Sequence, residues 1–236
     1  METQTVEQRT PIAPQTTRVW AAVRIAVGVS VIAVLLYAYT LRIAVGDANP
    51  FDYFGYFTNQ TSSIAALVLI GAGVLVASGR PVPPWFVLLR GIVTAYLIVV
   101  GVIYNVLVPG TGSAPPWVSV LLHVVFPLLV ALDWLLVGDR HRLPWRRLWM
   151  LLPYPLIWLI VVLVRGVSDG WVPYGFLLPE RGVASLMLHI LGLLAAVLFA
   201  GALVWSASRF RGVWMRENAS PSAEPIFRGA PRRALR

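Results

Sequence analysis

The sequence predicts an all-α membrane protein, a bundle of six transmembrane helices. Of its 236 residues, 58% are hydrophobic and 12% are charged, and the mean hydropathy is +0.75. A soluble domain of this size could not bury so much apolar surface, so the bilayer must serve as its solvent. The apolar residues also fall into six separate windows, each long enough for a membrane-spanning helix. Tryptophans near the window ends fit interfacial positions.

The six predicted spans are Val19–Leu41, Gly55–Ala77, Trp85–Val108, Trp117–Val137, Leu148–Val164 and Val183–Ser206. The first is too long for the core of a signal peptide and lacks a small-residue cleavage site, so we expect it to be retained. Proline- and glycine-rich turns, such as Pro109-Gly110-Thr111-Gly112, separate the spans. The fifth span is the least regular, because Pro153 and Pro155 interrupt its first turns.

The second span begins with a polar run, Thr58-Asn59-Gln60-Thr61-Ser62-Ser63. The apolar stretch behind it, Ile64–Ala77, covers only about 21 Å of a hydrocarbon core that is roughly 30 Å thick. The helix must therefore draw part of the polar run into the bilayer. Polar groups there are costly without partners, so the run marks either a functional site or a polar contact between helices.

Arginine placement predicts the topology. The tails and the second and fourth loops carry most of the arginines: Arg9, Arg18, Arg80, Arg140, Arg142, Arg146, Arg147, Arg209, Arg211, Arg216, Arg228, Arg232, Arg233 and Arg236. The opposite side has only Arg42, Arg165 and Arg181. By the positive-inside rule, we expect both termini of this multi-pass protein of the cell membrane to be cytoplasmic.

This topology divides the chain into three parts. Residues 1–18 form a cytoplasmic tail, residues 19–206 the six-helix domain, and residues 207–236 a basic cytoplasmic tail that we expect to be disordered and to face anionic headgroups. The net charge of +9 does not indicate nucleic acid, because the arginines flank hydrophobic segments.

The topology also brings polar residues to one depth on the outer side. Thr58 lies in the first turn of the second helix, and His123 and His189 each lie six residues inside their helices, about 9 Å down the axis. We expect these residues to line a site that opens on the outer side, which we call the mouth. Further candidates for the mouth are Asn59, Gln60, Tyr104, Asn105, Trp171 and Tyr174. Pro127 has no N–H for the His123 carbonyl, so that carbonyl could bind a hydroxyl or a water.

Each feature also has a purely structural interpretation. Thr58 could cap its helix or bond to its own backbone, and either histidine could simply join two helices. The aromatic residues of the mouth fit an interfacial belt. Asp133, with Arg24 and Arg90 at a similar depth on the cytoplasmic side, fits a structural ion pair. Asp133 lies about 15 Å from His123 along the helix, so Asp169 or a backbone carbonyl would have to orient that imidazole.

A hydroxyl and an imidazole are the minimum for nucleophilic acyl transfer. Thr58 would attack an ester carbonyl, and His123 would take its proton and return it to the leaving alcohol. Asn59, Gln60, Asn105 or an indole could stabilise the oxyanion. The sequence has no cysteine and no motif for a soluble serine hydrolase, a zinc protease or a nucleotide-binding protein, so we expect no metal and no cofactor. A substrate in the outer leaflet would be lipid-like.

At these positions the chain resembles the androgen-induced membrane hydrolase family, which includes the ADTRP-type proteins. The resemblance rests on Tyr56-Phe57-Thr58-Asn59-Gln60, on Trp117, His123 and Pro127, and on Tyr154-Pro155, Trp158 and Trp171-Val172-Pro173-Tyr174. It covers about half of the chain. It implies six spans, a Thr58–His123 catalytic pair, and a substrate that is a fatty acid ester of a hydroxy fatty acid.

Two other classes of function remain open at this point. The polar groups could knit together a non-catalytic membrane scaffold, or a transporter, although no repeat symmetry favours transport. His123 and His189 could also ligate haem in a redox protein, although only two intramembrane histidines are present and two-haem bundles need four.

Overall fold

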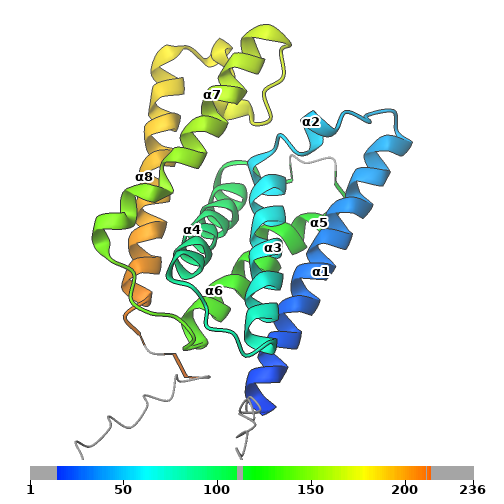
Figure 1. Ribbon diagram of the computed structural model, residues 1–236. Coiled ribbons are helices and arrows are strands. Elements are labelled where there is room, and N and C mark those ends of the chain that lie inside the picture. Colours follow the sequence, from blue (N-terminus) through cyan, green and yellow to red (C-terminus); the bar gives the residue numbers. More distant parts are fainter. Residues whose placement is uncertain (1–14, 111–113, 211, 214–236) are drawn as a thin grey trace, which may run out of the picture.

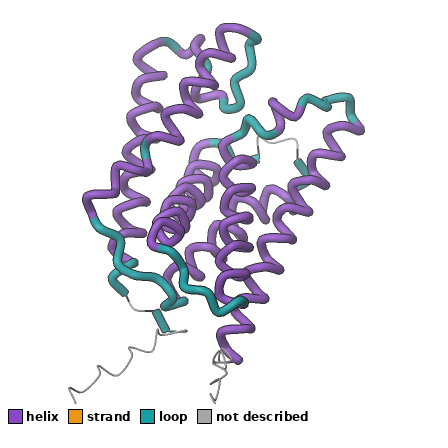
Figure 2. Tube along the Cα trace, viewed as in Figure 1, coloured by secondary structure: helices purple, strands orange, loops and turns teal. Residues whose placement is uncertain are grey.

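The computed structural model describes residues 15–110, 114–210 and 212–213. Its six long apolar helices confirm the predicted all-α membrane bundle. The candidate spans are Thr17–Ala44, Phe57–Ala77, Pro84–Leu107, Pro116–Leu136, Trp145–Ser168 and Val183–Ala207. Within the described residues the chain is helix and loop (Figure 2). The two predicted tails, residues 1–18 and 207–236, lie mostly outside these residues, so the disorder expected of the second tail stays a prediction.

The spans correspond to named helices in Figure 1. The first four are α1 (Gln15–Ala44), α3 (Phe57–Ala77), α4 (Pro84–Leu107), and the continuous series α5 (Pro116–Val120), η1 (Leu121–Val125) and α6 (Phe126–Leu136). The last two are η2 (Trp145–Leu151) with α7 (Pro153–Ser168), and α8 (Val183–Ala207). Short α2 (Pro50–Tyr53) precedes α3, while η3 (Gly175–Leu177) and η4 (Pro179–Arg181) lie between α7 and α8.

The fifth span differs most from its prediction. It begins as the 3₁₀ helix η2, is interrupted at Leu152, and continues as α7 to Ser168, past the predicted end at Val164. Pro153 opens α7, a position where the missing N–H costs nothing. The prolines therefore divide the span without ending it.

Helix α4 is central, with α1 and α3 on one side and α7 and α8 on the other (Figure 1). Small residues bring α1 and α3 together. A Cβ atom on Gly28 would lie 2.7 Å from the Ala66 carbonyl oxygen, and one on Gly73 would lie 2.7 Å from the Ala21 carbonyl oxygen. Such close backbone approach is the usual basis of helix packing in membranes. The N-terminal end of α1 and the C-terminal end of α8 lie at the same end of the bundle as the 137–147 loop (Figure 1), which we call the Arg-rich end.

Four charged side chains, none more than 11% exposed, join three spans near the Arg-rich end. The Arg24 guanidinium donates to Asp133 (2.7 and 3.1 Å) and to Asp139 (2.5 Å), and Arg90 donates to the same two carboxylates (2.9 and 3.0 Å). Both arginines are at most 3% exposed. The predicted pairing of Asp133 with Arg24 and Arg90 is therefore confirmed, and Asp139 completes the cluster.

Asp139 reaches this cluster because the chain turns back after α6. Val137 is extended, and Arg140 anchors the turn by donating to the Ala207 and Phe210 carbonyls at 3.1 Å. Burial alone would raise the pKa of Asp139, but the charges of Arg90 and Arg24 outweigh it and hold this pKa well below its usual range. Burial and the nearby Arg90 charge lower the pKa of Arg140 to about 10.

Removing one carboxylate from this cluster should destabilise the protein severely. We expect Asp133→Ala to cost about 3–5 kcal/mol, because two buried guanidinium groups lose a partner. The matched control is Asp47→Ala, which removes a carboxylate 44% exposed and paired with Arg42, and should cost at most about 1 kcal/mol. Thermal unfolding in detergent, followed by tryptophan fluorescence, measures both. Equal midpoints in the two variants would contradict the structural role of the cluster.

The same cluster predicts a pH dependence. A carboxyl whose folded-state pKa is depressed stabilises the fold above its unfolded pKa, near 3.9, and this stabilisation is lost as the pH falls toward the folded value. The unfolding midpoint should therefore stay level from neutral pH to about pH 5 and fall below about pH 4. In the Asp139→Asn variant, the decrease of the unfolding midpoint below about pH 4 should be smaller than in wild type. A decrease of the same size in both proteins would exclude Asp139 as its source.

Candidate functional site

A largely apolar cavity lies between α4, α7 and α8, on the Arg-poor half of the bundle. Its volume is about 70 Å³, counted as the space open to the centre of a water molecule. Its lining consists of Phe57, Thr58, Val99, Val100, Ile103, Tyr104, Val108, Pro155, Trp158, Leu159, Tyr174, Phe176, Ile190, Leu193, Leu194 and Val197. Only Thr58, Tyr104 and Tyr174 bring a hydroxyl to this lining.

Thr58 is held at the cavity by the start of α3. The N-cap residue, Tyr56, makes no side-chain capping bond, and the Tyr174 hydroxyl oxygen instead accepts the Thr58 N–H at 3.4 Å. Burial raises the pKa of Tyr174, although hydrogen bonds with the Thr58 side chain and backbone partly offset the rise. Tyr174 is therefore a neutral phenol whose hydroxyl lies beside Thr58 in the lining of the cavity.

Tyr174 is positioned by the loop between α7 and α8. Asp169 caps the loop by accepting the Trp171 N–H at 3.0 Å, and it also pairs with Arg165 at 2.7 Å. The Trp171 N–H and Arg165 hold the pKa of the exposed Asp169 below its usual range. The Tyr174 ring is stacked on Phe176 at 5.3 Å and meets Tyr56 edge-on at 5.8 Å. These contacts fix the phenol over the first turn of α3.

His123 lies behind an aromatic residue of the lining. Its imidazole is stacked on the Tyr104 ring, with centroids 3.5 Å apart and an interplanar angle of 12°, but it does not itself line the cavity. Nδ1 is 2.8 Å from the Ser119 carbonyl oxygen, which can only accept, so Nδ1 carries the proton and Nε2 has the lone pair. A backbone carbonyl, rather than Asp169, orients this ring.

The segment around His123 departs from a regular α-helix. Residues Leu121–Val125 form a π-helical turn just before Pro127, and such turns often occur at functional sites. The Asn105 amide donates to the Gly101 carbonyl (2.7 Å) and the His123 carbonyl (3.3 Å). Pro127 has no N–H to donate to the His123 carbonyl, and this carbonyl instead accepts a hydrogen bond from Asn105 on α4.

His189 repeats this arrangement on α8. Both histidines occur in a Ser-x-x-Leu-His sequence, and the His189 Nδ1 is 2.8 Å from the Ser185 carbonyl oxygen. Its imidazole is stacked on Phe176 at 5.7 Å, and Phe176 lines the cavity. Each intramembrane histidine thus lies one aromatic ring away from the cavity, with the same tautomer.

The remaining predicted site residues have other partners. The Asn59 amide donates to the Tyr53 carbonyl at 2.7 Å, and Gln60 accepts the Tyr154 hydroxyl at 2.6 Å. Gln60 and Trp171 line a second cleft, near Arg165, instead of the Thr58 cavity. The structure therefore brings Thr58, Tyr104 and Tyr174 together and places Asn59, Gln60, Asn105, Trp171, His123 and His189 around them.

The hydroxyl groups of the polar run that begins at Thr58 have different surroundings. Thr61 and Ser63 donate to backbone carbonyls four residues earlier, both at 2.7 Å, as intrahelical hydroxyls commonly do. The Ser62 hydroxyl is fully buried and has no partner among the described residues. For Thr58 no bond to its own backbone and none to His123 occurs in the described part of the chain. Thr58 alone of this run reaches the cavity.

Sequence reasoning missed the walls of the cavity. Phe176, Ile190, Leu193, Leu194 and Val197 are apolar residues in or beside an apolar helix, and nothing in their spacing distinguishes a cavity wall from a lipid-facing surface.

Comparisons with family models, with curated proteins and with solved structures find no match to this chain. The fold and site therefore define the class of protein only as a six-span helical membrane protein with an apolar cavity that carries hydroxyl groups. Among the described residues, no group of three or more His, Asp or Glu side chains is placed to hold a metal ion.

Proposed function

We propose that this protein hydrolyses a lipid-like ester in the cavity, with Thr58 as the nucleophile. The observation that carries the proposal is a threonine, 7% exposed, whose side chain lines an apolar cavity beside the Tyr174 hydroxyl. The short motifs that resemble the androgen-induced membrane hydrolases support the same assignment.

The proposed reaction follows acyl transfer. The Thr58 hydroxyl oxygen attacks the ester carbonyl carbon and gives its proton to His123 Nε2, which passes it to the departing alcohol. Water then hydrolyses the acyl-threonine and releases the fatty acid. Because the Tyr104 ring separates His123 from the cavity, this proton transfer requires that ring to turn aside.

Tyr174 has a distinct role in this proposal. Since its oxygen accepts the Thr58 N–H, its proton can point to the ester carbonyl oxygen, on which negative charge develops. The positive end of the α3 dipole favours the same charge.

The setting of this reaction is proposed as well. With the Arg-rich end in the cytoplasm and against anionic headgroups, the cavity faces the outer leaflet of the cell membrane. A lipid-like ester can reach it from that leaflet.

A second candidate is a protein that binds a lipid chain without catalysis. The observation that favours it is the position of His123, which is stacked behind Tyr104 rather than bonded to Thr58. The two candidates differ in turnover and not in binding.

Substitution of the proposed pair tests the hydrolase directly. In purified protein supplied with fatty acid esters, Thr58→Ala and His123→Ala should each lower kcat by about 10³-fold or more, as expected when one member of a nucleophile–base pair is lost. A lipophilic fluorophosphonate should label wild type and not Thr58→Ala. The matched controls are Thr61→Ala, a buried threonine one turn away, and His141→Ala, in the Arg-rich loop. Turnover that persists in Thr58→Ala would leave only the binding function.

Removal of the Tyr174 hydroxyl tests the proposed role of Tyr174 as a hydrogen-bond donor to the oxyanion. Tyr174→Phe keeps the aromatic stacking but should lower kcat by about 10²-fold with little change in KM, because one donor to the oxyanion is lost. Tyr96→Phe is the control, since it removes another buried phenol, bonded to the Leu151 carbonyl at 2.8 Å, away from the cavity. Equal kcat values in the two variants would reject this role for Tyr174.

A further inference from the structure

Thr58 lies at the inner end of the cavity, the end nearer to the Arg-rich end of the bundle. The ring of Phe57, the residue before it, meets the Tyr96 ring edge-on, with centroids 5.8 Å apart. Tyr96 does not line the cavity, and the lining on α4 begins about one turn further out, at Val99 and Val100. This contact therefore places Thr58 level with the innermost residues of the lining.

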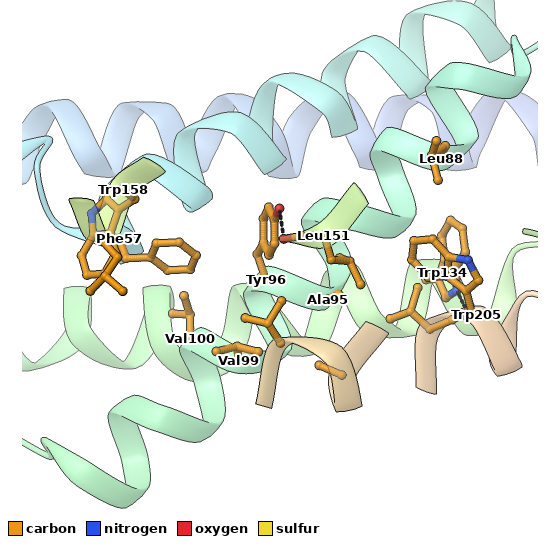
Figure 3. Close-up of a cluster of buried hydrophobic side chains, with 14 of the residues drawn as sticks. Phe57, Leu88, Ala95, Tyr96, Val99, Val100, Trp134, Leu151, Trp158 and Trp205 are labelled. Atoms are coloured by element: carbon orange, nitrogen blue, oxygen red, sulfur yellow. Dashed lines mark hydrogen bonds between the residues drawn. The ribbon is translucent and has the colours of Figure 1, made fainter. Parts of the chain in front are cut away.

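The protein is closely packed behind this inner end. Tyr96 is 3% exposed, and its hydroxyl donates to the Leu151 carbonyl at 2.8 Å (Figure 3). Leu151 is fully buried, and a Cβ atom on Gly201 would overlap its Cδ1. A molecule bound at Thr58 therefore cannot extend inward without displacing this layer.

The walls of the cavity differ in their exposure. The lining residues from α3, α7 and η3 are all buried: Phe57, Thr58, Pro155, Trp158, Leu159 and Phe176. Tyr174 in the loop is half-buried, and so are the lining residues from the outer part of α4, including its C-cap, and from α8 before Val197: Ile103, Tyr104, Val108, Ile190, Leu193 and Leu194. Leu194 lies about 16 Å from the start of α8. The cavity is therefore open along its α4–α8 side, and this opening continues well into the span.

This opening faces the bilayer. Val102 on α4 and Leu191 on α8 each neighbour a lining residue, and they are 54% and 64% exposed. Both lie inside candidate spans, so their surroundings are the acyl chains of lipids. In the described part of the chain, the lining has hydroxyl groups but no charged side chain. An uncharged part of a lipid can therefore enter between α4 and α8, whereas a charged group would lose its solvation without gaining a partner.

We infer that this opening is a portal, with Ile103, Ile190 and Leu194 at its rim, through which an uncharged lipid ester enters from the bilayer. The inference rests on the proposed function and names its substrate class: an ester that is dissolved in the membrane and has no charge near the ester group. Because Thr58 lies at the closed inner end and the walls from α3 and α7 are buried, a long chain of the substrate leaves through the portal. That chain remains among the lipids while the ester group reaches Thr58.

Bulky substitutions at the rim test the portal. With p-nitrophenyl oleate in phosphatidylcholine vesicles, Ile190→Trp and Leu194→Trp should each lower kcat/KM by about tenfold or more, because one misfitting methylene group in an apolar site already costs that much. The matched control is Leu191→Trp, which adds bulk to the same helix at a residue that is 64% exposed and outside the lining. It should leave kcat/KM unchanged.

Photolabelling tests entry without turnover. The probe is oleate methyl ester with a diazirine close to its ester group, in nanodiscs that contain the wild-type protein. It should label Val100 and Val197, which line the cavity and are 5% and 3% exposed. Free oleate with the same diazirine should label them about tenfold less, because its carboxylate would have to leave water.

The outcomes separate the portal from the reaction. A lower kcat/KM in the two rim variants alone supports the portal, and equal values in wild type and all three variants overturn it while hydrolysis stands. If wild type hydrolyses no ester, the proposed reaction fails, and photolabelling then decides the portal. Labelling of Val100 and Val197 by the ester alone supports it. Labels confined to lipid-exposed residues such as Leu191, or equal labelling by ester and acid, overturn it. Because photolabelling uses wild type, it keeps the test valid if a tryptophan variant does not fold.

Discussion

The bundle depends on one set of paired charges near the Arg-rich ends of the spans. Arg24, Arg90 and Asp133 come from three different spans, and Asp139 comes from the loop that follows one of them. A single unpaired charge buried there would strongly destabilise the fold, so each member requires the others. The cluster thereby fixes α4 against α1 and α6, and with α4 it fixes the frame in which the cavity is formed at the other end of the same helix.

The same rule of internal pairing governs the site. In a bilayer, polar groups must find partners in the protein, and the polar groups near the cavity have largely done so. His123 and His189 bond to serine carbonyls, Asn105 to two carbonyls, and Asn59 and Gln60 to the surrounding tyrosines and backbone. Among the described residues, the groups that remain for chemistry at the cavity are the hydroxyls of Thr58, Tyr104 and Tyr174, with the Nε2 atoms of the two histidines behind the lining. Because so few polar groups near the cavity remain available, Thr58 and Tyr174 are its main candidates for chemistry.

The first turn of α3 joins the site to the packed core. At the start of α3, a loop phenol replaces the usual capping side chain, so the contact between Tyr174 and Thr58 serves both helix stability and the site. Next to it, the Tyr96 hydroxyl donates to the Leu151 carbonyl, and Phe57 packs on the Tyr96 ring.

The sequence by itself determined the six spans, their order and the pairing of Asp133 with Arg24 and Arg90, because apolar length and the cost of an unpaired charge are properties of the chain alone. It also singled out Thr58, since a polar run at the start of a short apolar stretch is visible without coordinates. Only the tertiary structure decided which polar groups share a cavity. It placed His123 behind Tyr104, turned Gln60 toward Tyr154, and brought Asp139 back to the ion cluster. Depth along a helix can be read from residue numbers, but the face a side chain presents depends on how the helices rotate and pack against one another, and that is set by contacts distant in sequence.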